Sequence, residues 1–313
     1  MRTDLSTGLA LAATALAGLF MAFQSRANGT LAEVVGTGIH AATLSFAGGM
    51  VVMVIALALV PAGRRGFRAL AAALRSGELR WWMLTGGLGG VSVVVAQAFT
   101  VPLIGVSVFT MAFVAGQLAG ALVVDSTELP PGGRTPATPA RLLGTLVVMT
   151  GVVVASWGGT AGAFPLWAPL VPFASGALTT VQQALNGRVK RTTASAVTAT
   201  TVNFAVGGTF LLACSALAWA AGAPPAEFPA LPGESWMLVG GLVGVLFIGI
   251  TTTTVQRLGV LLLSLTSLFG NLLGSLVLDL VFPGSPPVTP GTLVGMAIVL
   301  AGVTLASWPK GAE

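Results

Sequence analysis

Residues 116–120 read Gly-Gln-Leu-Ala-Gly and lead to Asp125, and 154 residues later 270–274 read Gly-Asn-Leu-Leu-Gly and lead to Asp279. Further matches between the two halves include polar and tryptophan positions, which chance similarity between apolar helices does not explain. They are 24–29 with 182–187, 45–49 with 203–207, 82–88 with 236–242, 105–106 with 259–260, and 144–157 with 295–308. The chain therefore contains an internal repeat.

The composition excludes a soluble globular protein. Hydrophobic residues make up 55% of the 313 residues, charged residues only 7%, and the mean hydropathy is +0.93, whereas soluble chains carry about 25% charged residues. A net charge of +5 would indicate nucleic acid in a soluble protein. Here the basic residues lie between apolar runs, so no nucleic-acid partner is expected. One cysteine, Cys214, and one histidine, His40, exclude a disulfide framework and argue against a metal site.

The apolar runs predict an all-α integral membrane protein with ten transmembrane helices. The runs are continuous rather than alternating, which does not fit a β-barrel, and each approaches the roughly 20 residues that one crossing needs. The expected segments are 7–25, 36–60, 81–101, 104–124, 141–158, 166–186, 194–221, 236–256, 258–282 and 292–308.

The distribution of Lys and Arg predicts the orientation. With ten crossings, only Arg26 falls on the side opposite the N-terminus. The other side receives Arg2, Arg64, Arg65, Arg68, Arg75, Arg80, Arg134, Arg141, Arg188, Lys190, Arg191, Arg257 and Lys310. Basic loops stay in the cytoplasm, so both termini are expected to be cytoplasmic.

The repeat predicts two domains of five helices each, 1–160 and 161–313. Because five is odd, the second copy enters the membrane from the opposite side, and the repeat is inverted. Inverted repeats are typical of secondary transporters, in which the substrate site lies near the midplane between the halves. Architecture alone does not fix function.

The repeated motifs resemble those of the YdcZ family of the drug/metabolite transporter superfamily. These motifs are the Gln-x-x-x-Asn-Gly at 24–29 and 182–187, the Phe-x-x-Gly at 46–49 and 204–207, and the Gly-Gly-Leu at 86–88 and 240–242. The resemblance covers nearly the whole chain as two fused copies. It implies export or exchange of a small metabolite or drug across a bacterial inner membrane, without an ATP motor, and no cofactor is expected.

Repeated amide side chains are the first candidates for a substrate site, because polar groups in a bilayer need partners or water. Gln24 and Asn28 are four residues apart and share one helix face, as do Gln182 and Asn186. They could line a cavity and bind a polar substrate. The alternative is that they bond to other helices or cap helix ends ahead of the following glycine.

Four more residues face the same choice between binding and packing. Asn203 and its counterpart Ser45 follow the amide pairs in sequence, and Asn203 is the costlier group to bury. Gln117 and Asn271 lie among glycines spaced four apart, which is the pattern of close helix contact. They are candidates for the pocket lining or for helix packing.

Four titratable residues could couple protons or form a gate. His40 could relay protons or only hydrogen-bond near a helix end. Asp125 and Asp279 could form gating ion pairs or end their helices at the interface. Arg26 could bind an anion or form a gate, or it could snorkel at the outer surface and pair with Glu33.

The sequence therefore predicts a secondary-active transporter, an exporter or exchanger that works by alternating access. The alternatives are a structural or regulatory membrane subunit and a channel. An enzyme is not expected, since no nucleophiles, carboxylates or metal ligands cluster. The expected partners are a small-molecule substrate and the lipid bilayer, and a monomer would suffice, although a dimer is possible. A helix break is expected in the polar stretch 97–102 and its counterpart 251–254.

Overall fold

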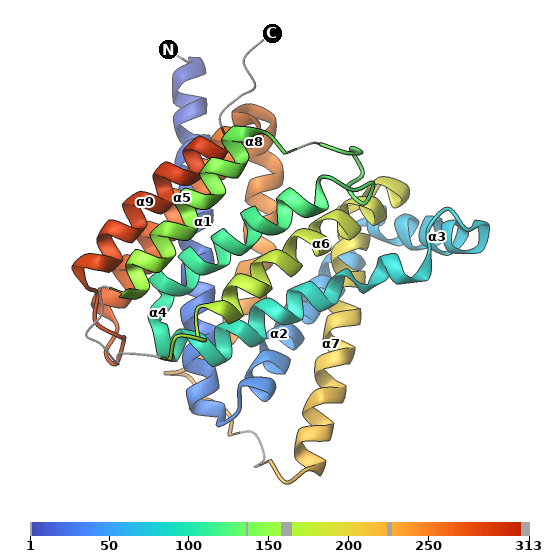
Figure 1. Ribbon diagram of the computed structural model, residues 1–313. Coiled ribbons are helices and arrows are strands. Elements are labelled where there is room, and N and C mark those ends of the chain that lie inside the picture. The colour runs from blue at the N-terminus through green and yellow to red at the C-terminus, as the bar shows by residue number, and fades with distance from the viewer. Residues whose placement is uncertain (1, 136, 158–164, 224–226, 308–313) are drawn as a thin grey trace.

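The computed structural model describes residues 2–135, 137–157, 165–223 and 227–307, and the regular elements in these residues are helices (Figure 1). The α-helices are α1 (Arg2–Val35), α2 (Gly38–Leu59), α3 (Pro61–Ser76), α4 (Gly87–Val124), α5 (Pro139–Trp157), α6 (Leu170–Thr193), α7 (Ala196–Ala220), α8 (Gly240–Val281) and α9 (Pro290–Ala306). Short 3-10 helices, η1 (Trp81–Gly86) and η2 (Ser235–Val239), precede α4 and α8.

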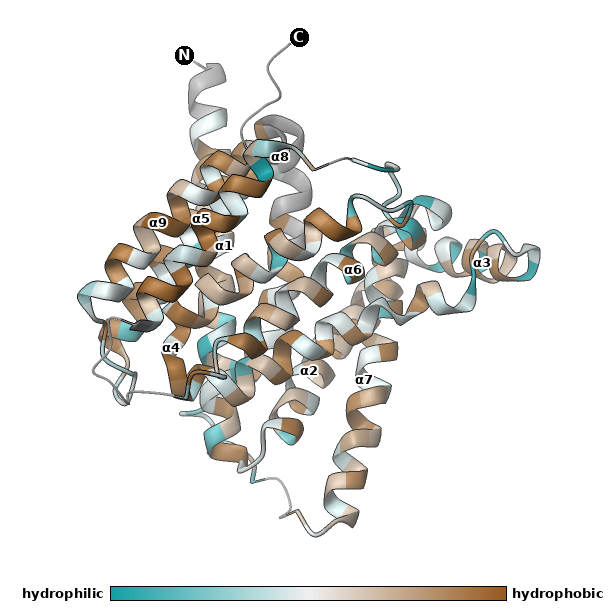
Figure 2. Cartoon of the chain, viewed as in Figure 1, coloured by the Kyte–Doolittle hydropathy of each residue, from teal (hydrophilic) through white to brown (hydrophobic). Residues whose placement is uncertain are grey.

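Six helical segments are long and apolar enough to cross a membrane. They are Thr7–Val35, Gly38–Leu59, Trp81–Val124, Pro139–Ser156, Ala196–Ala220 and Leu262–Val281. Most of the helical ribbon in Figure 2 has the brown and pale colours of apolar and intermediate residues, and teal is prominent around α3. These helices agree with the predicted all-α membrane protein.

Helices at equivalent positions of the two halves begin in the same way. The hydroxyls of Thr37 and Ser195 accept the backbone N–H three residues further on, at 3.3 and 3.1 Å, and start α2 and α7. Thr138 and Thr289 do the same for α5 and α9, at 3.3 and 3.1 Å. Such caps satisfy backbone donors that have no partner within the helix. The two halves therefore share local folding signals as well as apolar runs.

Two equivalent helix pairs join the halves, α1 with α8 and α6 with α4. Glycines bring their backbones together, and the contacts on one pair recur on the other at the spacings of the sequence repeat. They are Gly18 against Ser267, Gly176 against Phe113, Gly270 against Ala15, and Gly116 against Phe173. In each case a Cβ would overlap the backbone of the partner helix. Small residues allow such close packing in membranes.

Two further contacts between the halves, of α5 with α9 and of α2 with α7, are also reciprocal. In α5 and α9, Gly144 faces Gly302 and Gly151 faces Gly295. In α2 and α7, the rings of Phe46 and Phe204 meet with centroids 5.2 Å apart. The repeated positions of the sequence are thus the positions at which the two halves touch.

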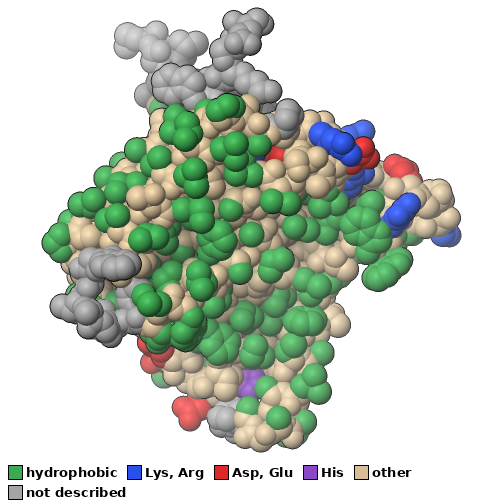
Figure 3. All heavy atoms as spheres, viewed as in Figure 1, with side chains coloured by type: hydrophobic (Ala, Val, Ile, Leu, Met, Phe, Trp, Pro, Cys, Tyr) green, Lys and Arg blue, Asp and Glu red, His purple; other side chains and the backbone are tan. Residues whose placement is uncertain are grey.

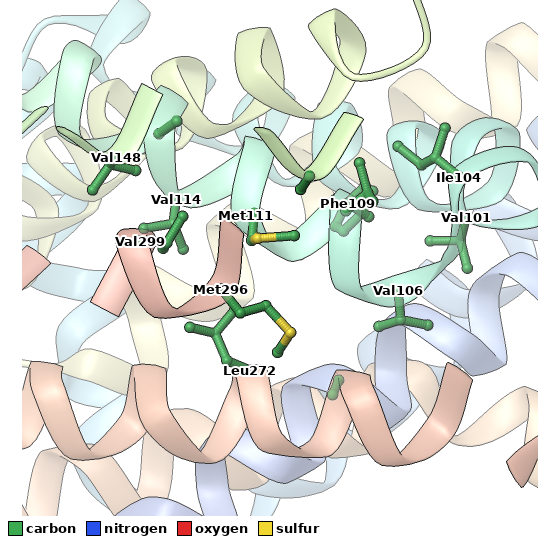
Figure 4. Close-up of a cluster of buried hydrophobic side chains, with 14 of the residues drawn as sticks. Val101, Ile104, Val106, Phe109, Met111, Val114, Val148, Leu272, Met296 and Val299 are labelled. Atoms are coloured by element: carbon green, nitrogen blue, oxygen red, sulfur yellow. The ribbon is translucent and has the colours of Figure 1, made fainter. Parts of the chain in front are cut away.

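A buried apolar cluster holds α4, α5, α8 and α9 together (Figure 4). Val106, Met111 and Val148 are fully shielded, and Leu272 and Val299 approach them from the second half. Because lipid tails are as apolar as these side chains, dispersion contacts rather than exclusion of water favour this packing.

Two predicted segments end too early. The first was expected to end at residue 25 and the sixth at 186, but α1 continues to Val35 and α6 to Thr193. The glycines that follow the amides do not end these helices. Gly29 lies inside α1, where a Cβ would meet the side chain of Val101. The alternative that the amides cap helix ends is therefore wrong.

The structure also differs from the prediction of ten separate helices in the regions between the predicted segments. Residues 61–76, expected as a loop, form α3, whose buried Gly63 and Gly66 pack against α7. The segments 81–101 and 104–124 are continuous through α4 except at Gly105, which has φ 74° and ψ 168°. The expected helix break therefore lies at Gly105, three residues beyond Pro102. The segments 236–256 and 258–282 merge into α8.

Candidate substrate site and gates

Amide side chains of α1 and α4 form a buried hydrogen-bond chain. Asn28 Nδ2 donates to Gln97 Oε1 at 2.6 Å, and Gln97 Nε2 donates to Ser25 Oγ at 3.0 Å. Asn28 and Gln97 are each 1% exposed. Together with Gln24 and Ser45, these residues are here called the first amide cluster.

The second amide cluster consists of Gln182 and Asn186 of α6 and Asn203 of α7. Asn203 Oδ1 accepts two hydrogen bonds, from Gln182 Nε2 at 3.0 Å and from Asn186 Nδ2 at 3.1 Å. Asn203 is buried, whereas Gln182 and Asn186 are partly exposed. Asn28 of the first matched pair and both amides of the second pair thus hydrogen-bond to polar residues of their own half, and Gln24 shares the helix face of Asn28.

Each cluster faces glycines of the other half. A Cβ on Gly240 would lie 2.6 Å from Asn28 Oδ1 and 2.8 Å from Ser45 Oγ. At the equivalent place, a Cβ on Gly86 would lie 2.7 Å from Asn186 Oδ1. The two clusters therefore lie at the boundary between the halves, against backbone that carries no side chain.

Two amide oxygens of the first cluster lack donors. Gln24 Oε1 and Asn28 Oδ1 are buried and have no hydrogen-bond partner among the described residues. A buried polar atom without a partner costs about 1–3 kcal/mol. An N–H or O–H group of a ligand at this boundary would relieve that cost.

Gln97 was not among the residues chosen from the sequence as substrate ligands. Its counterpart at the repeat spacing is Thr251, so a search for repeated amides passes over it. The available signal was its place as a lone amide in an apolar run. It connects α4 to the amides of α1 and completes the first cluster.

Gln117 and Asn271 lie apart from these hydrogen bonds. Their backbone nitrogens approach Gly176 and Gly18, at the closest contacts of α4 with α6 and of α8 with α1. This placement favours the packing alternative over the pocket lining. Asn271 Oδ1 is nevertheless buried without a partner in the described residues.

His40 and Asp125 each have a polar partner, His40 across the boundary between the halves and Asp125 within its own half. The His40 ring hydrogen-bonds the hydroxyl of Ser215, joining α2 to α7 near the cap of α2. Asp125 forms an ion pair with Arg141 at 2.6 Å, within the first half. These contacts match the plainer alternatives, a hydrogen-bonded histidine and a carboxylate at a helix end.

Arg26 and Asp279 are buried. This contradicts the alternatives that Arg26 snorkels at the outer surface and that Asp279 lies at the membrane interface. Arg26 is 7% exposed, so it does not snorkel to the surface, and it forms no ion pair with Glu33 in the described residues. Asp279 is 8% exposed and accepts the backbone N–H groups of Val106 at 2.9 Å and Ser107 at 2.7 Å. It therefore binds the start of the helix that follows Gly105 instead of facing the interface.

The described residues contain no group of three His, Cys, Asp or Glu side chains that could hold a metal ion. Their buried polar groups are instead amides and hydroxyls, together with one imidazole (His40), one arginine (Arg26) and one aspartate (Asp279). Fold and site together define an all-helical membrane protein with polar clusters at the boundary of two matching halves. Such an arrangement is typical of membrane transporters.

A family model described as "Putative inner membrane exporter, YdcZ" matches residues 9–154 and, a second time, residues 167–305. The chain therefore belongs to the YdcZ family and contains two copies of it. This membership supports a membrane transporter of the inner membrane and fits a protein that is not an enzyme. No curated protein matches the chain.

Proposed function

We propose that the protein is a secondary-active transporter, an exporter or exchanger, that moves a small metabolite or drug-like solute by alternating access. The substrate site lies between the two repeats, at the two amide clusters. Gln24, Asn28 and Ser45 would bind from the first repeat, and Gln182, Asn186 and Asn203 from the second. We propose no catalytic residue and no cofactor.

The observation that carries the proposal is the pairing of each amide cluster with glycines of the opposite repeat. Asn28 of the first repeat faces Gly240 of the second, and Asn186 of the second faces Gly86 of the first. A change in the angle between the repeats therefore changes the space beside both clusters. Ligand sites of transporters with internal repeats occupy this kind of boundary.

The proposed membrane topology has ten crossings in two inverted repeats, 1–160 and 161–313. The segment Trp81–Val124 has 44 residues and α8 has 42, which is about twice the length of one crossing. We therefore count α4 and α8 as two crossings each, with α4 broken at Gly105. Equivalent helix pairs at equivalent glycines support a two-fold relation between the repeats.

The proposed orientation places both termini in the cytoplasm of a bacterium. The start of α1 and the end of α9 lie at the same end of the molecule (Figure 1). Lys and Arg side chains on the face shown in Figure 3 gather at the end that carries α3. Positive charge is retained on the cytoplasmic side. We call the end that carries the two termini and α3 the inner end, and the opposite one the outer end.

The site favours a substrate that donates hydrogen bonds. Among the described residues, the buried atoms of the two clusters without a hydrogen-bond partner are the amide oxygens of Gln24 and Asn28, and no carboxylate belongs to either amide cluster. A neutral, zwitterionic or weakly amphipathic solute with N–H or O–H groups fits this chemistry. The proposed partners are this solute and the bilayer, with no nucleic acid. A monomer contains both repeats and would suffice.

The test is thiol accessibility from each side of the membrane, because it needs no knowledge of the substrate. In a Cys214→Ala background, Asn28→Cys and Asn186→Cys are made separately and treated with a membrane-impermeant reagent in oriented vesicles. Ala22→Cys is the control on α1, since Ala22 is fully buried against α8. A change of solvent access at the clusters should not reach it.

We expect Asn28→Cys and Asn186→Cys to react from both sides, and Ala22→Cys from neither. Reaction from both sides together with a leak of small solutes would indicate the channel alternative. Protection of both positions in a folded protein would refute the proposal, because the amides would then be interhelical bonds of a structural or regulatory subunit.

A further inference from the structure

Arg26 ties the outer ends of the two repeats together. Its Nη2 donates to the carbonyl oxygen of Pro283 at 3.3 Å, and its guanidinium lies 5.1 Å from the centroid of the Phe282 ring. Arg26 belongs to α1 of the first repeat, and both partners follow α8 in the second. The contact is partly buried, and Trp236 packs on Phe282 with ring centroids 5.5 Å apart.

Asp279 adds a second tie at the same end. Its carboxylate, in the second repeat, accepts two backbone N–H groups directly after Gly105, in the first repeat. A carboxylate at these unpaired donors is favoured by the helix dipole. The outer clasp, consisting of Arg26, Asp279 and the residues they hold, therefore joins α1 and α4 to the end of α8.

An equivalent clasp exists at the inner end. Arg188 of α6 donates through Nε to the carbonyl oxygen of Leu129 at 2.6 Å and through Nη2 to that of Glu128. Arg191 donates to the carbonyl of Pro131. These arginines belong to the second repeat, and the loop after α4 belongs to the first. We call this arrangement the inner clasp.

The two clasps use equivalent carbonyls. Leu129 and Pro283 are 154 residues apart, which is the repeat spacing of this region. The arginines differ in position, since Ala184 is the counterpart of Arg26 and Arg188 lies one turn further along α6. The sequence repeat therefore did not reveal the pairing. In Figure 1, the loop after α4 and the loop after α8 lie at opposite ends of the molecule.

We propose that the outer and inner clasps are the two gates of the transporter, and that Arg188 and Arg191 are the inner counterparts of Arg26. This inference depends on the proposed function, because alternating access requires that contacts between the repeats break at one end while they hold at the other. Each clasp joins the repeats at only one end, so removing it favours opening at that end.

The clasps also differ in their carboxylates. Asp279 binds across the boundary, whereas its counterpart Asp125 pairs with Arg141 inside its own repeat. The outer gate therefore has a buried carboxylate that the inner gate lacks. Asp125→Asn is accordingly a control for Asp279→Asn, because it removes the equivalent charge from a contact that lies within one repeat.

The experiment measures labelling of Asn186→Cys from each side in the Cys214→Ala background, now with gate variants. Arg26→Gln and, separately, Asp279→Asn should raise the ratio of outer to inner labelling about tenfold, since hydrogen bonds of charged groups are the strong ones. Arg188→Gln combined with Arg191→Gln should lower the ratio by a similar factor. Asp125→Asn should leave it unchanged.

Opposite shifts for the two ends support the assignment. Two outcomes would show that the gates are wrongly assigned: both sets of variants shift the ratio in the same direction, or neither shifts it. In either case the transport proposal still stands, provided that the parent protein labels from both sides. If the parent labels from neither side, the proposed function itself fails. Monodispersity and thermal unfolding of each variant verify folding, and Asp279→Asn tests the outer gate independently should Arg26→Gln not fold.

Discussion

The close contact of α6 with α4 predicts a large effect of a single methyl group at Gly176. A Cβ there would overlap the carbonyl oxygen of Phe113 and would lie 2.9 Å from the backbone nitrogen of Gln117. Neither atom can rotate away, because both belong to helix backbone. Gly176→Ala must therefore push the two helices apart along the boundary between the repeats.

The magnitude follows from a matched control. Gly208 lies in α7, and no atom of the described residues comes within 4 Å of its Cβ position, so Gly208→Ala should gain up to about 1 kcal/mol of helix propensity. Gly176→Ala has the same gain but also the strain of overpacking, typically about 1–3 kcal/mol. The difference between the variants in free energy of unfolding should therefore be about 1–3 kcal/mol. Gly18→Ala, at the equivalent contact of α1 with α8, should behave like Gly176→Ala.

The assay is thermal unfolding of the purified variants in one detergent, followed by tryptophan fluorescence and by the loss of monodisperse protein. Gly176→Ala and Gly18→Ala should unfold clearly below Gly208→Ala, which should itself unfold at or above the parent. Equal melting temperatures for all three would refute the helix pairing, since the methyl group would then meet no backbone. A loss at only one of the two equivalent glycines would refute the reciprocity of the contacts.

Two further substitutions test the site and the helix break by the same unfolding measurement. Asn203→Ala removes the acceptor of two hydrogen bonds, worth about 0.6 kcal/mol each on average in a membrane, and should destabilise the protein by about 1 kcal/mol. Ser45→Ala, at the equivalent position of the first repeat, is the control and should change the stability by less. A larger loss for Ser45→Ala than for Asn203→Ala would contradict the hydrogen bonds of the second amide cluster. Gly105→Ala should lose about 1–3 kcal/mol, because φ 74° and ψ 168° suit glycine almost exclusively, and an unchanged stability would mean that α4 is not broken there.

Sequence patterns predicted most of the helical architecture because the relevant signals are local. Continuous apolar runs mark helices that can lie in lipid, and glycines repeated at 116, 120, 270 and 274 mark surfaces of close approach. In the structure these glycines lie at the contacts between the repeats. The match in sequence thus reflects a match in packing.

The helix ends and the partners of charged residues could not be predicted in the same way. Gly29 and Gly187 resemble helix stops, but Val101 packs on the first of them and the helix continues. Whether a glycine ends a helix depends on what lies beside it in space. Likewise, the burial of Arg26 depends on Phe282 and Pro283, more than 250 residues further along the chain.

The helix α3 was missed because it is not apolar enough to be read as a crossing. Its arginines at 64, 65, 68 and 75 suggest a loop when counted for orientation. Its buried side consists of Gly63, Gly66, Leu70 and Ala73, which repeat at helical spacing. The helical spacing of these small and apolar residues was therefore the feature of the sequence from which α3 could have been predicted.

The central claim, that every molecule exposes the amide clusters to the two sides in turn, is tested most directly by sequential labelling of Asn186→Cys. The inner side is first treated to completion with an impermeant reagent, and a second, distinguishable reagent is then added to the outer side. If each molecule alternates, the first reagent consumes all the thiols and no second label is incorporated. A remaining fraction that reacts only from the outer side would contradict the claim, because the population would then consist of molecules fixed in different states or orientations.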